Sequence, residues 1–256
     1  MSKLSRILKI IIPIAAIIFG VTVMAYAAPP LPIPKIGLDI STADNPQEVA
    51  VSLQILFLLT ILSLAPSLLI MLTSFTRIII VFSFMRNALG TQQMPPNQVL
   101  IGLSLFLTFF IMTPVIKDVN AQAYQPYVKG QITQQVAFTK AMDPVREFMF
   151  KYTRNKDLAL FMNLSGNMKA VEPKDVPTTA LIPAFIISEL KTAFQIGFFL
   201  YIPFLMVDMV VSSVLMSMGM MMLPPVLISM PFKILLFVMV DGWNLLTRAI
   251  ILTFNR

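Results

Sequence analysis

Cysteine and histidine are both missing from this chain of 256 residues. Without cysteine there is no disulfide and no thiolate metal site, and without histidine the chain lacks the commonest general base and metal ligand. The 9 glycines form neither a dinucleotide-binding G-x-G-x-x-G pattern nor a nucleotide-binding P-loop. These absences indicate that the chain is not an enzyme and that it binds no cofactor or metal.

Charged side chains are also scarce. Only 12% of the residues are charged, 57% are apolar, and the mean hydropathy is +0.83. These values lie well outside the range of water-soluble globular domains. The composition therefore predicts a membrane protein that needs lipid or partner subunits to cover its apolar side chains.

The N-terminus has the features of a secretory signal peptide. A basic start precedes an uncharged apolar core from Ile10 to Val23, and residues 25–27 form a small-x-small cleavage site. We expect residues 1–27 to be removed by cleavage after Ala27. An uncleaved membrane anchor is the alternative, although the core is short for a span of ~20 residues. Cleavage removes three basic residues and lowers the formal charge from +7 to +4, so nucleic-acid binding has little support.

Two regions with different chemistry follow the signal. Residues 28–48 are rich in proline and form an extended lead segment that begins outside the cytoplasm. Residues 49–116 are predicted to form a hydrophobic helical hairpin. Its arms are the uncharged stretches Val49–Thr76 and Asn87–Ile116. Arg77 and Arg86 lie between them without an acidic residue, and the positive-inside rule places this connection in the cytoplasm.

Residues 117–177 differ in character, because they hold nine basic and six acidic residues. We expect a solvated helical region here, with Asp143 as the N-cap of a helix and Pro144 at its first position. Phe148 and Phe161 recur on apolar faces of this region. Closure of a small helical subdomain is the simpler interpretation, and the alternative is that both rings face a partner or a passage.

Residues 178–256 are predicted to form a second hydrophobic hairpin with a methionine-rich tip. The helical pattern breaks at Gly219 and at Pro224-Pro225. Five methionines crowd into this tip: Met216, Met218, Met220, Met221 and Met222. Methionine is flexible and polarizable, so a ring of such side chains could seal a pore and yield to a passing chain. Simple core filling is the alternative. Irregular backbone at membrane depth favours a loop that lines a cavity.

Three ionisable residues stand out within otherwise apolar sequence, namely Glu189, Asp208 and Lys233. A rise of ~1.5 Å per residue places Asp208 and Lys233 roughly 12 Å apart in depth within one hairpin. We therefore expect these two side chains to pair between adjacent copies of the chain rather than within one. A proton relay through Asp208 is the alternative. Together with the other apolar stretches, the hairpins predict about four membrane spans.

Two stretches resemble a known family. PAFIISELKTAFQIGF (183–198) and PFLMVDMVVSSVLMSMGM (203–220) are similar to the signature sequences of the FliP family of flagellar and type III secretion export-gate proteins. The MGMMMLPP sequence of the tip and residues 74–115 are also similar to that family. The resemblance extends from about Val49 to the C-terminus.

The resemblance implies an all-helical, polytopic membrane protein whose helical hairpins assemble into a multi-subunit export gate. Several copies would join FliQ and FliR subunits in the bacterial inner membrane, within the flagellar basal body, and unfolded export substrates would pass through the lumen. The family's methionine gasket maps onto Met220, Met221 and Met222. The same subunit in a virulence injectisome is one alternative. An ion-coupled transporter is another, but it predicts inverted repeats, and only one interrupted hairpin is visible.

Overall fold

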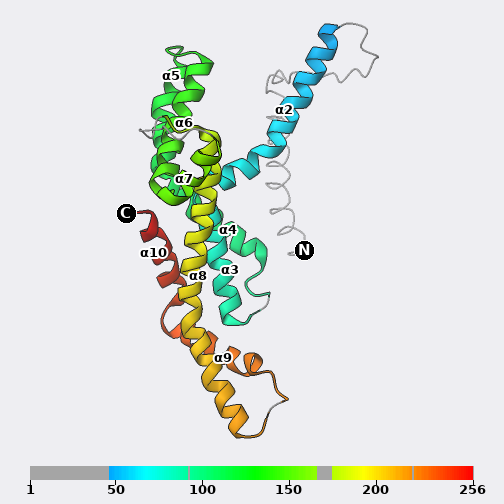
Figure 1. Ribbon diagram of the computed structural model, residues 1–256, viewed down its shortest axis with the longest axis vertical. Coiled ribbons are helices and arrows are strands. Elements are labelled where there is room, and N and C mark those ends of the chain that lie inside the picture. The colour runs from blue at the N-terminus through cyan, green and yellow to red at the C-terminus, as the bar shows by residue number, and fades with distance from the viewer. Residues whose placement is uncertain (1–45, 92, 166–174, 221, 256) are drawn as a thin grey trace, which may run out of the picture. The chain divides into compact units, whose positions relative to one another are not determined.

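The computed structural model of the chain describes residues 46–91, 93–165, 175–220 and 222–255. Every regular element within these ranges is a helix, which confirms the all-helical fold (Figure 1). The chain divides into two compact units, Met1–Ile55 and Leu56–Arg256. The predicted signal, its cleavage site after Ala27 and nearly all of the proline-rich lead lie outside the described residues.

The region predicted as a two-armed hairpin contains three helices. They are α2 (Pro46–Met71), α3 (Phe75–Leu89) and α4 (Asn97–Val119). The backbone of Gly90 has a φ of +77°, a left-handed conformation that ends α3. Arg77 and Arg86 therefore lie on a helix between the two apolar stretches, and the cytoplasmic placement of this connection stays a prediction.

The charged region is helical, but its main helix begins earlier than expected. It contains the π-helix η1 (Asn120–Tyr124), α5 (Gln125–Val128), α6 (Gln134–Tyr152) and α7 (Asn155–Leu164). The Thr133 hydroxyl caps α6 by accepting a hydrogen bond from the Val136 backbone N–H at 3.5 Å. The prediction that Asp143 caps this helix is wrong, because Pro144 lies in the middle of α6 and is buried there.

The C-terminal region forms a long helix and a broken second arm. Helix α8 (Thr178–Ser217) is followed by α9 (Pro225–Met239) and α10 (Gly242–Phe254). The backbone of Asp241 adopts a left-handed conformation with a φ of +50°, and the two helices it separates are bent by 65°. The second arm of the predicted hairpin therefore consists of two helices rather than one.

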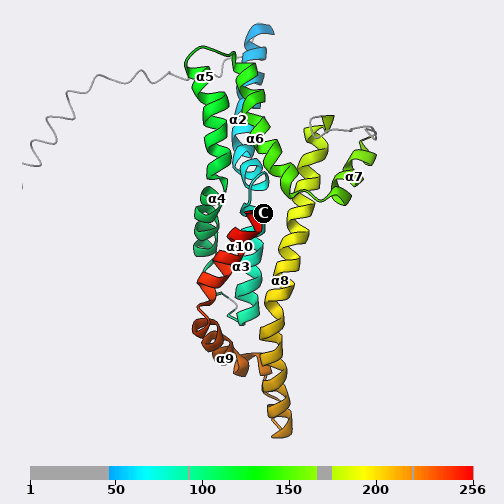
Figure 2. The same cartoon turned by 90° about the vertical axis from the view of Figure 1, so that its left-hand side faces the viewer.

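Helix α3 supplies the centre of the core and lies alongside α8 in both views of the ribbon (Figures 1 and 2). Ile78, Val81, Phe82 and Met85 of α3 are buried in one hydrophobic cluster with Leu181 and Phe185 of α8. Gly197 of α8 has no side chain, and the ring of Phe84 on α3 occupies the space that a Cβ atom would need. This close approach brings the two helices together near the middle of α8.

Two helical segments of the described residues are long and apolar enough to cross a membrane. They are Asn97–Val128, which combines α4, η1 and α5, and Thr178–Ser217, which is α8. A third span results if α9 and α10 cross together as one bent pair. The four predicted spans are therefore too many for the described residues, because α8 joins two apolar stretches into a single helix and α2 contributes only the shorter apolar segment Ser52–Leu68.

Candidate functional site

The methionine tip is shaped by the end of α8. The N–H of Met220 bonds to the carbonyl of Leu215 at 3.0 Å, and the N–H of Gly219 bonds to the carbonyl of Met216 at 3.1 Å. Gly219 has a φ of +74°. This pair of bonds around a left-handed glycine is a Schellman motif, which ends a helix and satisfies its last carbonyls. Pro224 and Pro225 then start α9, since proline suits the first helical positions.

The methionines at the tip project away from the rest of the chain. Met216 and Met218 are exposed, Met220 is 40% exposed, and Met222 is 98% exposed. Met221 lies outside the described residues. The neighbouring Leu223 is exposed as well. Within this chain alone, these methionines do not fill a core, so the core-filling interpretation fails for the side chains that the structure describes.

Asp208 and Lys233 pair within one chain. The Lys233 ammonium lies 2.6 Å from Oδ2 of Asp208, and the Ser229 hydroxyl donates to Oδ1 of the same carboxylate. The side chain of Lys233 is 1% exposed and that of Asp208 is 22% exposed. The expected pairing between adjacent copies is therefore wrong for this chain.

The prediction failed because it counted the loop residues as helix. Helix α8 ends at Ser217 and α9 begins at Pro225, so the loop between them adds no helical rise. Asp208 lies nine residues before the end of α8, and Lys233 lies eight residues after the start of α9. Both side chains thus sit at nearly the same depth, at ~1.5 Å of rise per residue.

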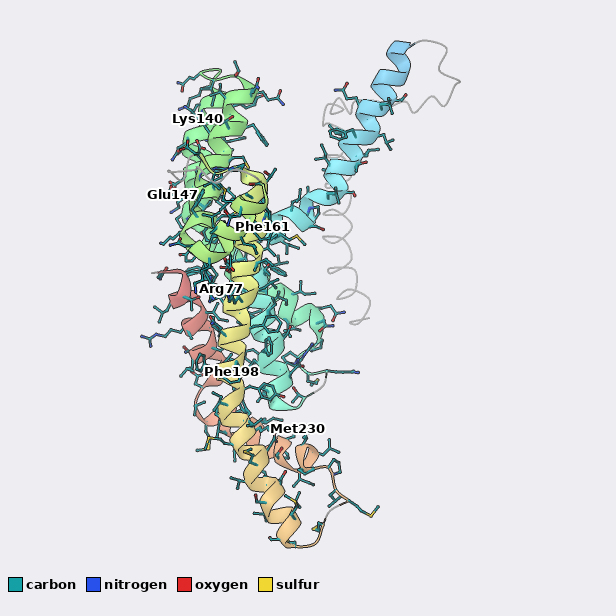
Figure 3. The ribbon with its side chains drawn as sticks, in the orientation of Figure 1. Arg77, Lys140, Glu147, Phe161, Phe198 and Met230 are labelled. Atoms are coloured by element: carbon teal, nitrogen blue, oxygen red, sulfur yellow. The ribbon has the colours of Figure 1, made fainter. Side chains whose placement is uncertain are left out.

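A second ion pair joins α3 to α8. The guanidinium of Arg77 donates from Nε to Oε2 of Glu189 at 2.8 Å and also donates from Nη2 to Oε1. The Glu189 side chain is fully buried, and Arg77 is nearly so. Figure 3 shows Arg77 beside α8. This two-oxygen contact pairs the two charges with each other in the interior of the helical packing.

Further contacts of Arg77 extend this ion pair to α6 and α10. Arg77 donates from Nη1 to the Thr253 hydroxyl at 2.9 Å, and its guanidinium carbon lies 3.9 Å from the centroid of the Phe254 ring. The Tyr152 hydroxyl donates to the carbonyl of Phe254. The end of α10 is therefore held against α3 and α6. Sequence reasoning singled out Glu189 but missed Arg77 as its partner, and the only signal was an arginine within the apolar run FTRIII.

The two phenylalanines predicted to face a passage belong to the core side of the charged region. Phe148 is buried, and its ring packs against those of Tyr152, Phe185 and Phe254. Phe161 is partly buried against the same hydrophobic cluster. The alternative in which Phe148 faces a partner or a passage is therefore wrong for this chain, and the simpler interpretation of a closed helical subdomain holds there.

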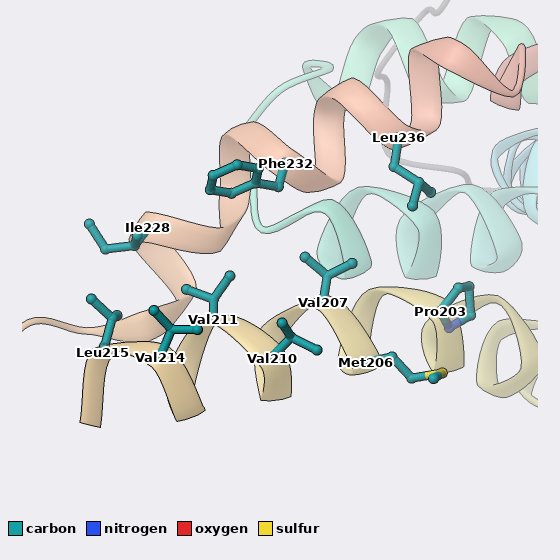
Figure 4. Close-up of a pocket in the computed structure, with 10 residues that line it drawn as sticks. All are labelled: Pro203, Met206, Val207, Val210, Val211, Val214, Leu215, Ile228, Phe232 and Leu236. Carbon is teal, nitrogen blue, oxygen red and sulfur yellow. The ribbon is translucent and has the colours of Figure 1, made fainter. Parts of the chain in front are cut away.

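An apolar groove of about 690 Å³ lies between α8 and α9. Its ten lining residues are all apolar, and Val207, Val211 and Phe232 are among them (Figure 4). Other apolar side chains of α8 are exposed as well, among them Phe198 and Phe199. Apolar side chains exposed along a helix and a groove in this way are typical of surfaces that bind lipid or another protein.

In the described part of the chain, no three acidic side chains gather closely enough to hold a metal ion. What the fold does present is a long apolar helix, a bent apolar arm, ion pairs buried between helices and a projecting methionine tip. These features define an all-helical membrane protein.

Comparison with known proteins gives the family. A model of the FliP family matches residues 58–250. The chain is 58% identical over 217 residues to "Flagellar biosynthetic protein FliP" of Bacillus subtilis, covering 85% of this chain and 98% of that protein. It is 56% identical over 208 residues to the protein of the same name from Pectobacterium carotovorum, with 81% of each chain covered. The protein of that name from Treponema pallidum is 51% identical over 229 residues, or 89% of this chain and 84% of its own length. The chain therefore belongs to the FliP family, which confirms the resemblance seen in its sequence.

Proposed function

We propose that this chain is a structural and gating subunit of the flagellar type III protein export channel in the bacterial inner membrane. Family membership and relatives named as flagellar biosynthetic proteins support the flagellar assignment. The chain serves flagellum assembly as a component of the basal body, and it has no catalytic role of its own.

The methionine tip is the seal of this channel. The observation that carries this proposal is the 98% exposure of Met222 at the end of a hairpin whose turn is fixed by Gly219. Long unbranched side chains on such a turn can fill an irregular passage and move aside at little cost. Met220, Met221 and Met222 from several copies together form the gasket.

The subunit acts as part of a homo-oligomer with FliQ and FliR. The exposed apolar groove between α8 and α9 supports this step, because an apolar surface of this kind needs a covering partner or lipid. Unfolded export substrates then pass through the lumen that the assembled subunits enclose. Energy for transport comes from other components, since the chain has no nucleotide-binding motif.

Ion leak across the inner membrane tests the seal. Cells in which Met220, Met221 and Met222 are all changed to alanine are compared with unaltered cells at matched levels of assembled complex. The matched control changes Met94, Met209 and Met239 to alanine, because these three methionines are also exposed but lie outside both the tip and the apolar groove. We expect the tip variant to leak while export continues, and the control variant to remain tight.

The two results that would contradict the proposal are distinct. If the tip variant does not leak although the complex is intact, the tip methionines do not form the seal. Equal leak in both triple variants shows that loss of methionine anywhere loosens the assembly. Flagellar motility, measured in the same strains, reports separately on the export role.

A further inference from the structure

A cavity with several charged and hydroxyl side chains in its lining lies at the corner where α6 ends and α7 begins. It has a volume of about 520 Å³ and is also lined by α8 and α10. Five of its polar lining residues are Arg77, Lys151, Arg154, Thr192 and Thr253. It differs in chemistry from the apolar groove between α8 and α9, because three of its lining side chains are cations. Its size is within the usual range for small-ligand sites.

Only one of these three cations is neutralised. Arg77 is paired with the buried carboxylate of Glu189 behind the cavity. In the part of the chain that the structure describes, neither Lys151 nor Arg154 has a carboxylate oxygen within 4.0 Å. The nearby carboxylate of Asp157 is already engaged, since it accepts a hydrogen bond from the Ser188 hydroxyl at 2.9 Å and lies 4.0 Å from Lys191. The buried carboxylate of Glu189 also interacts electrostatically with Arg154, but one carboxylate cannot balance three cations, so the cavity carries a net positive charge.

Arg154 is fixed in place before any ligand arrives. Its backbone N–H donates to the Ser188 hydroxyl at 3.0 Å, and its Nη2 donates to the Thr192 hydroxyl at 3.3 Å and to Oε1 of Gln195. A guanidinium held in this way loses little side-chain freedom when it binds an anion. The structure describes no acceptor for its Nε and Nη1 groups, so these donors remain for a ligand.

We infer that this cavity is a binding site for a phosphate-type oxyanion, contacted by Arg154 and Lys151. A fixed arginine fork and a mobile ammonium suit the several oxygens of such a group, and charge-assisted hydrogen bonds to them are strong. The same chemistry is offered by the headgroup of an anionic phospholipid and by a free phosphate or pyrophosphate. Lys151 is exposed at this cavity, which leaves it open to either source, and α8, a helix apolar enough to cross a membrane, forms one of its walls.

Ligand binding to the purified full-length chain in detergent tests this inference. Native mass spectrometry counts bound phosphatidylglycerol, phosphatidylcholine and inorganic pyrophosphate in separate titrations. The test variant is Lys151→Gln, and the matched control is Lys140→Gln, which makes the same charge change at an exposed position of α6 outside the cavity. We expect the unaltered chain to bind an anionic ligand, Lys151→Gln to weaken binding about tenfold, and Lys140→Gln to leave it unchanged.

The pattern of binding identifies the source of the oxyanion. Binding of phosphatidylglycerol but neither phosphatidylcholine nor pyrophosphate assigns the site to a lipid headgroup, and binding of pyrophosphate assigns it to a free anion. Equal affinity for phosphatidylglycerol and phosphatidylcholine, or equal weakening by both lysine variants, overturns the inference. Arg154→Lys provides a second variant that keeps the charge but loses the fork, and unweakened binding there also overturns it.

Discussion

Lys233 on α9 reaches Asp208 on α8 across 25 positions of sequence, with 2.6 Å between the ammonium nitrogen and the carboxylate oxygen. The pair closes the C-terminal hairpin within a single chain. It also fixes how far the tip projects, because α8 continues for nine residues beyond Asp208 before the turn. The methionine tip therefore stands at a set distance from a buried charge pair.

Removal of the Asp208 carboxylate should destabilise the hairpin. Asp208→Ala leaves the ammonium of Lys233 buried without a partner, and we expect the free energy of unfolding in detergent to fall by about 2–4 kcal/mol. Changing both residues, as Asp208→Asn with Lys233→Met, should recover most of this loss because no buried charge remains. Lys191→Ala is the control, since its ion pair spans 4.0 Å and its side chain is 52% exposed. If Asp208→Ala lowered the free energy of unfolding no more than Lys191→Ala, the prediction would be contradicted.

Breaking the ion pair between Arg77 and Glu189 should lower the free energy of unfolding even more than removing the Asp208 carboxylate. Arg77→Met leaves a fully buried carboxylate unpaired, and we expect a loss of about 3–5 kcal/mol. Arg77→Lys keeps the charge but cannot contact both oxygens in the same way, so an intermediate loss is expected. The matched control is Arg86→Lys on the same helix, where the guanidinium bonds to Asn97 and has no buried carboxylate partner among the described residues. Thermal unfolding of the purified variants, followed by circular dichroism, ranks them.

The left-handed turn at the tip should depend on Gly219. Gly219→Ala places a Cβ atom on a backbone with a φ of +74°, which costs about 1–2 kcal/mol. No neighbouring atom lies within 4 Å of that Cβ, so the cost comes from the backbone alone. Gly102→Ala is the control, because Gly102 lies inside α4 with equally open space and should gain about 0.5–1 kcal/mol. In chemical unfolding, we expect the free energy of unfolding to fall for Gly219→Ala and to rise for Gly102→Ala. A change of the same sign in both variants would refute this account of the turn.

The contact between α3 and α8 should not tolerate a methyl group at Gly197. A Cβ atom there would lie 2.5 Å from the Phe84 ring and 3.0 Å from the Phe84 Cβ. The ring can rotate but its Cβ cannot, so we expect Gly197→Ala to cost about 1–3 kcal/mol. Adding Phe84→Leu should restore part of that stability, measured again by thermal unfolding. A fully stable Gly197→Ala variant would show that the helices can separate freely.

The sequence predicted the local structure correctly where a single residue type determines the backbone conformation. Gly219 and the Pro224-Pro225 pair predicted the break between α8 and α9, and the structure ends and restarts the helices there. The same kind of rule failed at Pro144. That residue suits a first helical position, but the Thr133 cap upstream starts the helix earlier and the core encloses the proline.

Relationships between distant residues could not be read from the sequence. Arg77 and Glu189 are 112 positions apart, and no local pattern marks them as partners. Asp208 and Lys233 are closer, but their pairing depends on where helix gives way to loop, and an error of a few residues changes the predicted depth by several ångströms. Phe148 shows the same limit, because helical spacing places its ring on an apolar face without showing which helix covers that face.

Helix α8 runs for 40 residues, a length of about 60 Å and twice the ~30 Å of a bilayer's hydrocarbon core. Glu189 and Asp208 both lie on it, with Pro203 between them. Proline removes one backbone hydrogen bond, so a helix bends most easily there. Two ion pairs therefore hold α8, one on each side of Pro203. A bend at this proline would move the methionine tip and Asp208 together, and it would leave the contact between Arg77 and Glu189 in place.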